Sequence, residues 1–261
     1  MRKRFVRQRQ KEFVHRVEDE IVRFIDGEVD VVRPLITYAK LSRISNFAQG
    51  KLTAEYDLVK KRTEAIKRRL EALLEPSPDV AYFLGTLIFG ASAMPNKGCY
   101  AFRGKYSEVM FGHFGELCQK YFFRLPRVTK DGVFVCNNTV FDIIGNLDSN
   151  HWPEILLERY GWIFEDKDSA LAFISAMFDY RGIFNTRKLT AQLSNKHGAE
   201  LILEMLRLVG VKDAYITEFY YKKAARYRVQ VGKQIEIADL LRQLQCRNPQ
   251  RQEVVQSLSK V

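Results

Sequence analysis

Residues 172–184 read AFISAMFDYRGIF, an apolar run that is interrupted near its end by Asp179, Arg181 and Gly182. A second run at 82–93, YFLGTLIFGASA, has a similar mixture of aromatic, aliphatic and small residues. Each run predicts a buried helix whose C-terminal end reaches a surface. The residue types at those two ends therefore decide what chemistry the surface can perform.

The order of predicted elements repeats around these two runs. The first copy consists of a helix at 79–91, a hairpin at 98–111, a helix at 111–123, a hairpin at 124–137 with an Asp131-Gly132 turn, and a short helix near 138–147. The second copy has a helix at 169–180, a hairpin at 182–195, a helix at 197–210, a strand pair within 211–232 and a helix at 234–244. Two such units, about 90 residues apart, predict an α+β protein with an internal duplication.

Composition points to a globular protein with a polyanionic partner. The hydrophobic fraction is 46%, which is ordinary for a folded domain, and the net charge is +11 with a pI near 9.5. A basic excess of this size favours nucleic acid as the partner. The four cysteines have no CxxC spacing, so free thiols and no structural metal site are expected. No apolar run is long enough for a membrane span, and we expect an intracellular protein, cytoplasmic or associated with the nucleoid.

The first 75 residues differ in charge and predicted secondary structure from the rest of the chain. They hold 18 lysines and arginines against 12 acids, and 53–74 has the 3.6-residue apolar period of a helix that Thr53 can cap. Upstream, 35–51 predicts shorter helices that end in a Gln49-Gly50 turn. We predict a basic helical domain at 1–75, possible as a helix-turn-helix DNA reader or as a helical bundle with a solvated charged face. Its candidate DNA contacts are Lys60, Lys61 and Arg62.

The duplicated unit resembles the LAGLIDADG homing-endonuclease family over roughly residues 79–245. The two runs resemble its signature helix, with Gly85 and Ala176 at the third motif position and Ala91 and Gly182 at the last. The resemblance implies two signature helices packed side by side on a pseudo-twofold axis, and two antiparallel sheets that form a saddle on the DNA major groove. It divides the chain into repeat 1 at 79–147, a joint at 148–167, repeat 2 at 168–245 and a polar tail at 246–261. Tandem repeats favour a monomer.

The family's catalytic acids are missing at the matching positions. The resemblance places a metal-binding acid at the penultimate motif position, which is Gly90 in the first copy and Arg181 in the second. Metal-assisted phosphodiester hydrolysis needs hard oxygen ligands, which neither residue supplies. We therefore expect no endonuclease activity, no metal and no cofactor. Asp179, at the sixth position, points away from the tip and is expected to cap a neighbouring element or pair with a cation. Arg181 is expected either to contact the phosphate backbone or to pair with a carboxylate such as Asp179.

On this fold the DNA-facing side chains come from alternate residues of the sheets. The candidates in the first copy are Tyr100, Phe102, Arg103, Lys105, Arg127 and Lys130, and those in the second are Arg181, Asn185, Arg187, Lys188, Gln192, Lys222, Lys223, Arg226 and Arg228. The aromatic residues at 219–221 could stack on unpaired bases, although the alternation predicts that Phe219 or Tyr221 points inward.

The sequence predicts a catalytically inactive factor that binds double-stranded DNA sequence-specifically, as a transcription regulator or another DNA-organising protein. Three alternatives stay open. The first is an RNA-binding, maturase-like splicing factor. The second is an active endonuclease that uses displaced acids such as Asp179, Glu165 or Asp168. The third is a protein-interaction module whose charge is incidental.

Overall fold

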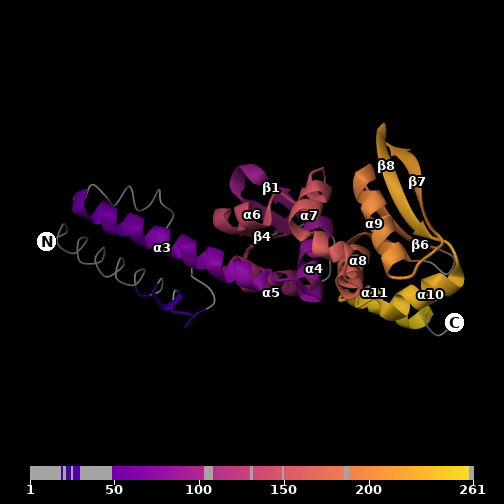
Figure 1. Ribbon diagram of the computed structural model, residues 1–261, viewed down its shortest axis with the longest axis horizontal. Coiled ribbons are helices and arrows are strands. Elements are labelled where there is room, and N and C mark those ends of the chain that lie inside the picture. Colours follow the sequence, from indigo (N-terminus) through magenta and orange to yellow (C-terminus); the bar gives the residue numbers. More distant parts are fainter. Residues whose placement is uncertain are drawn as a thin grey trace.

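The computed structural model in Figure 1 describes residues 19, 22–24, 26–29, 49–102, 108–129, 132–148, 150–184 and 188–258. Its elements confirm the predicted α+β class and the internal duplication. Each repeat has the order αββαββα expected from the LAGLIDADG resemblance. The helix-turn-helix prediction for the N-terminal region falls mostly on residues outside this description and stays a prediction.

Repeat 1 begins with the first signature helix, which consists of α4 (Pro78–Gly85) and a π-helical turn, η1 (Thr86–Gly90). The elements that follow are β1 (Ala91–Met94), the short 3₁₀ turn η2 (Pro95–Lys97), β2 (Cys99–Phe102), α5 (Glu108–Phe122), β3 (Arg127–Thr129), β4 (Gly132–Cys136) and α6 (Asn138–Ile144). The hairpin predicted at 98–111 was placed too late in the chain. Its first strand directly follows the signature helix at Ala91, and Glu108 already belongs to α5.

Repeat 2 begins with the second signature helix, α8 (Lys167–Arg181), after a joint formed by α7 (Trp152–Tyr160) and η3 (Gly161–Phe164). The remaining elements are β5 (Gly182–Phe184), β6 (Leu189–Leu193), α9 (Lys196–Leu208), β7 (Ala214–Tyr221), β8 (Ala224–Val231) and α10 (Gln234–Gln243). Short polar side chains fix where the helices start. Ser77 caps α4, Asp166 caps α8 and Asn195 caps α9, each accepting a hydrogen bond from a backbone N–H three residues on.

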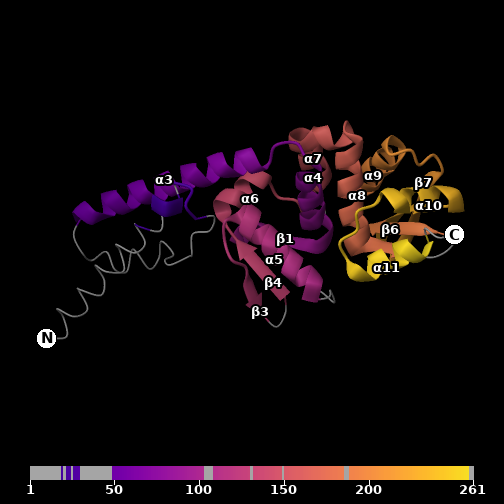
Figure 2. The same cartoon turned by 90° about the horizontal axis from the view of Figure 1, so that it is seen from below.

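The two repeats have the same sheet topology. Sheet A has the order β1-β2-β4-β3 and sheet B the order β5-β6-β8-β7, with all neighbours antiparallel. In both, the strand that directly follows the signature helix lies at one edge, and the last hairpin supplies the other edge. The duplication seen along the sequence is therefore also a duplication in space, as Figures 1 and 2 show from two sides.

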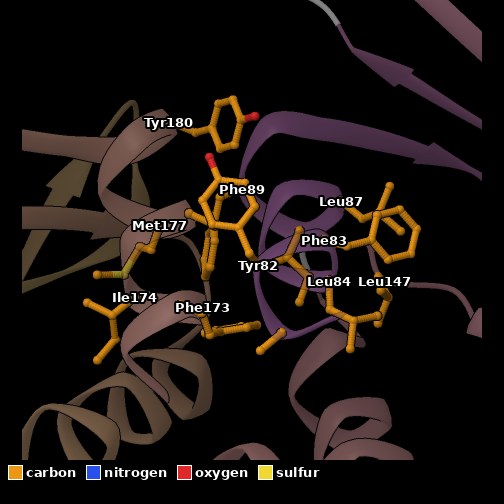
Figure 3. Close-up of a cluster of buried hydrophobic side chains, with 14 of the residues drawn as sticks. Tyr82, Phe83, Leu84, Leu87, Phe89, Leu147, Phe173, Ile174, Met177 and Tyr180 are labelled. Atoms are coloured by element: carbon orange, nitrogen blue, oxygen red, sulfur yellow. The ribbon is translucent and has the colours of Figure 1, made fainter. Parts of the chain in front are cut away.

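The signature helices pack against each other between the two sheets and form the centre of the core. Their backbones approach at Gly85, where a Cβ atom would lie 2.8 Å from the Ala176 Cβ and 3.1 Å from the Phe173 carbonyl oxygen. Buried aromatic and aliphatic side chains fill the remaining space, as Figure 3 shows for Tyr82, Phe89 and Met177 among others. Phe89 contacts Phe173 edge to face, with 5.4 Å between the ring centroids. The small residues Gly85 and Ala176, both at the third motif position, thus let the two helix backbones approach closely.

The long helix α3 (Gln49–Leu73) extends away from the repeats in Figures 1 and 2. The predicted turn at 49–50 was wrong, because both residues belong to this helix. Near its C-terminal end, Ala65, Ile66 and Leu70 are buried. The Arg69 guanidinium donates to the carbonyls of Phe24 and Val29, at 3.3 and 3.1 Å. These hydrogen bonds join α3 to the residues at 24–29, and the Arg69 guanidinium also lies 5.2 Å from the ring centroid of Phe123 in repeat 1.

The C-terminal stretch that was predicted to be a polar tail contains the helix α11 (Pro249–Leu258). Cys246 and Asn248, just before it, are buried. The free-thiol prediction holds for Cys118 and Cys246 but is wrong for Cys99 and Cys136, which form a disulfide. The two cysteines are 37 residues apart in sequence and directly opposite each other in the β2–β4 register. Sequence spacing alone does not reveal such a pairing.

Candidate nucleic-acid interface

The C-terminal ends of the signature helices meet at Gly90 and Arg181. A Cβ atom on Gly90 would lie 3.0 Å from the rings of Phe102 and Tyr180, so these side chains leave little room at this position. Arg181 is exposed, and its Nε donates to the Phe89 carbonyl oxygen at 3.0 Å. Arg181 thus joins the ends of the two helices. It occupies a carbonyl acceptor rather than the Asp179 carboxylate that was considered as its partner.

Asp179 faces the C-terminal segment. Its carboxylate is buried, with 1% of the residue exposed, and accepts hydrogen bonds from the Tyr82 hydroxyl at 2.6 Å and from the backbone N–H groups of Arg247 and Asn248 at 2.8 and 3.1 Å. Burial raises the pKa of this carboxyl above its usual value. Asp179 therefore caps the backbone that leads into α11, which is the capping role that was expected.

The other two displaced acids lie far from the helix ends. Glu165 and Asp168 are exposed at the start of α8, and Arg181 is its last residue. The 13-residue interval from Asp168 to Arg181 corresponds to about 20 Å along a helix. Among the residues that the structure describes, no group of three or more His, Cys, Asp or Glu side chains could hold a metal ion.

Sheet B has a core face and an outer face, which the strand registers define. Leu189, Ala191 and Leu193 are buried and pair with Val231, Val229 and Tyr227, which places these positions on the core face. We call the opposite side the outer face. Its side chains are Ile183 of β5; Thr190 and Gln192 of β6; Arg226, Arg228 and Gln230 of β8; and Tyr215, Thr217, Phe219 and Tyr221 of β7.

Charge is segregated between these two faces. Arg226 and Arg228 are half-buried on the outer face, and Gln192 is exposed beside them. The strands of sheet B contain one acid, Glu218, which pairs with Tyr227 and therefore lies on the core face. The outer face thus presents cations and amides without a carboxylate from its own strands. Such side chains bind phosphates and base edges.

The outer face of sheet A is different. The register places Ser92, Met94, Ala101, Phe134 and the Cys99–Cys136 disulfide on it, and Arg127 is the only cation among the described residues of its strands. Tyr100 and Phe102, predicted to face DNA, are fully buried on the opposite face against α5 and α6. That prediction was wrong because the sequence shows that side chains alternate along a strand, but it does not show which alternate set faces the core.

The candidate residues are spread over several parts of the molecule. The candidates on or beside the outer face of sheet B are Gln192, Lys222, Lys223, Arg226, Arg228 and Lys188. Arg127 lies on the outer face of sheet A, and Arg181 lies at the ends of the signature helices. Lys60 and Lys61 are exposed and Arg62 is half-buried on α3, apart from both sheets. Arg103, Lys105, Lys130, Asn185 and Arg187 lie outside the described residues.

Several outer-face residues were not among the candidates. Thr190 and Gln230 are buried on the two central strands of sheet B, and the Gln230 amide donates to the hydroxyl of Thr217, on the edge strand β7, at 2.7 Å. The inward orientation predicted for Phe219 or Tyr221 was wrong, because the register places both on the outer face. If the outward-facing residues of one strand had been known, the pairing register would have identified all the residues of the outer face, since paired residues lie on the same side of a sheet.

No helix among the described residues is long and apolar enough to cross a membrane.

Comparison with known proteins gives likenesses of fold only. No protein-family model matches this sequence, and no curated protein matches it. Among solved structures, the chain is similar to homing endonuclease I-DmoI in complex with DNA and Ca, with a TM-score of 0.48 and 16% identity over 70% of this chain and 98% of that one. The match to the N-terminal LAGLIDADG domain of DUF199/WhiA has a TM-score of 0.45 and 14% identity over 71% and 92%.

Full-length DUF199/WhiA from Thermatoga maritima gives a TM-score of 0.47 and 12% identity over 74% of this chain. This chain covers 65% of that protein, slightly less than two thirds of its length. Likenesses of this degree do not say what the chain binds, so its function has to be argued from its own surface.

Proposed function

We propose that this protein binds double-stranded DNA in a sequence-specific manner. The observation that carries the proposal is the outer face of sheet B, where Arg226, Arg228 and the exposed Gln192 share one side of the sheet and Glu218 lies on the other. Arginine and glutamine make bidentate contacts with base edges, and a two-stranded ribbon fits the major groove. Lysines at 222 and 223 add phosphate contacts at the end of the hairpin.

The protein binds DNA without cutting it. Glycine and arginine stand at the two positions where the signature motif has acids, and Arg181 would repel a divalent cation there. Asp179 is already bonded to the backbone ahead of α11. A factor that binds and does not cleave suits the role of a transcription regulator or DNA-organising protein. Since both repeats belong to one chain, it acts as a monomer inside the cell.

The test is selection of bound sequences from a random duplex pool at two salt concentrations, with and without Mg²⁺. We expect one long motif to be enriched and recovered uncut, and a supercoiled plasmid that contains it to remain unnicked. Binding without an enriched motif, fading steeply as salt rises, would reduce the protein to a general polyanion binder. Site-specific nicking would overturn the non-cleaving assignment.

RNA is the second candidate ligand. The observation that favours it is the exposure of Tyr220 and Tyr221 at the hairpin end, 72% and 57%, since exposed aromatic rings stack on unpaired bases. Competition between the selected duplex and a structured RNA of equal length separates the two ligands. RNA displacing the duplex at equal concentration would move it to first place.

A further inference from the structure

The β7–β8 hairpin ends in a turn of unusual composition. Tyr221 pairs with Ala224, so only Lys222 and Lys223 connect the strands, and both have positive φ angles of 48° and 65°. Two-residue turns of this kind favour asparagine and glycine, because a Cβ atom disfavours the left-handed region. The chain accepts this strain and places two ammonium groups at the end of the hairpin. Strain of this kind is often retained where a segment has a function.

Aromatic rings flank this turn on both faces. Phe219 and Tyr221 lie on the outer face, the side of Arg226 and Arg228, and Tyr221 is 57% exposed. Tyr220, 72% exposed, lies on the other face with Glu218. A phosphate-bearing ligand is attracted by the first face and repelled by the acid on the second. The charges therefore assign the nucleic-acid contact to Phe219 and Tyr221.

The spacing of these two rings suits a planar base. Residues two apart on a strand are separated by about 6.6–6.8 Å, and stacked bases along one DNA strand are about 3.4 Å apart. A base inserted between the rings can therefore contact both. The Arg228 guanidinium lies 4.6 Å from the Phe219 ring centroid, and Arg228 is opposite Thr217, farther from the turn than Phe219. The space between Phe219 and Tyr221 lies on the turn side.

We propose that Phe219 and Tyr221 form a stacking platform for one unpaired base in a DNA duplex, with Lys222 and Lys223 on the adjacent phosphates. The inference rests on the proposed function, DNA binding, and adds a structural feature of the DNA that is recognised. Base–aromatic stacking tolerates any sequence, because every base has a π face. The platform thus recognises a bulged or unstacked nucleotide rather than a particular base.

The experiment compares two fluorescein-labelled DNA duplexes that contain the selected sequence and are identical except for a single-nucleotide bulge. We expect the wild-type protein to bind the bulged duplex about tenfold more tightly than the perfect one. A 2-aminopurine at the bulge should lose fluorescence on binding, as it does on stacking. Tyr221→Leu should abolish the preference, and Tyr221→Phe should retain it, since stacking does not need the hydroxyl group.

Tyr220→Leu is the matched control. It removes an equally exposed tyrosine from the adjacent position, on the face that carries Glu218, and should leave the preference unchanged. Loss of the preference in this variant, or its survival in Tyr221→Leu, would overturn the platform. Equal binding of both duplexes by the wild-type protein would reject the inference and leave the proposed function intact. Failure to bind either duplex would reject both, and a preference seen only with a bulged RNA would reject DNA as the occupant.

Discussion

Single residues set how closely the two halves of this molecule can approach. Gly85 lets the signature helices pack backbone to backbone, and Gly90 lies against the rings of Phe102 and Tyr180. Arg181 then binds the Phe89 carbonyl at the end of η1, where a helix leaves acceptors unpaired. The helix ends are therefore held together by a cation, at the position where the signature motif carries an acid.

Gly85→Ala should destabilise the protein by about 1–3 kcal/mol, because the added methyl group would lie 2.8 Å from the Ala176 Cβ between two packed helices. Gly112→Ala is the control, since Gly112 lies in the exposed interior of α5 with nothing within 4 Å of an added Cβ. That change should stabilise the protein by about 0.5–1 kcal/mol, since glycine is a poor helix former. Urea denaturation of both variants measures the two effects, and equal shifts would contradict the close approach.

His113 should make the fold sensitive to mild acid. Burial first, and then the Arg247 guanidinium at 3.5 Å from its Nε2, lower the pKa of His113, while Glu116 opposes this. A histidine with a lowered pKa stabilises the fold above its unfolded pKa of about 6.5, and this contribution is lost as pH falls below that value. Between pH 7.5 and 5.5 the wild-type protein should therefore lose stability relative to His113→Gln, with a slope of at most about 1.4 kcal/mol per pH unit. Urea denaturation at each pH measures the free energy of unfolding of both proteins. Equal dependence of this free energy on pH in the wild-type protein and in His113→Gln would contradict this assignment.

At the scale of elements, the C-terminal segment ties the two signature helices together. Asp179 and Ser175 of α8 accept backbone N–H groups from this segment. Arg247 reaches α4, where it binds Asp79 at 3.1 Å and lies 4.1 Å from the Tyr82 ring centroid. Since Asp79 is 65% exposed, its ion pair contributes little, and the buried Asp179 contacts dominate this attachment.

The strained turn of the β7–β8 hairpin should show a trade-off between stability and binding. Replacing Lys222 by Asn and Lys223 by Gly removes the free-energy cost of holding these residues in the left-handed backbone conformation, about 1–2 kcal/mol per residue. The variant should therefore exchange its amide hydrogens in β7 and β8 more slowly. The same variant should bind DNA more weakly, because two charges are lost. Lys222→Gln with Lys223→Gln separates the effects, since it removes the charges and keeps the strain. Unchanged exchange in the Asn-Gly variant would show that the turn carries no strain.

At the scale of the whole molecule, the two repeats share a fold and differ in charge. Sheet B presents Arg226 and Arg228 on its outer face, whereas the strands of sheet A contribute only Arg127 beside an apolar surface. A second basic surface lies on α3, at Lys60 and Lys61, apart from both sheets. This distribution predicts that a polyanion would bind mainly through repeat 2.

Two charge-matched double variants test this distribution. Arg226→Gln with Arg228→Gln should lower the slope of log K against log salt by about 1.8 and weaken DNA binding at low salt, because two cations of the proposed interface, each of which would displace a counterion from the DNA, are removed. Lys60→Gln with Lys61→Gln removes the same charge and should leave the slope nearly unchanged. The reverse result would move the contact to the N-terminal helices and revive the helix-turn-helix interpretation.

The sequence by itself determined the duplication, the α+β class and the small residues at the helix contact, because each is encoded locally by periodicity, turn residues and residue size. It also identified Gly90 and Arg181 at the helix ends. Tertiary structure alone decided which phase of each strand faces the core, and so removed Tyr100 and Phe102 from the candidate interface and placed Phe219 and Tyr221 on it. It alone paired Cys99 with Cys136 and Asp179 with the backbone ahead of α11. These depend on contacts between residues 37 to 69 positions apart, which only the folded chain brings together.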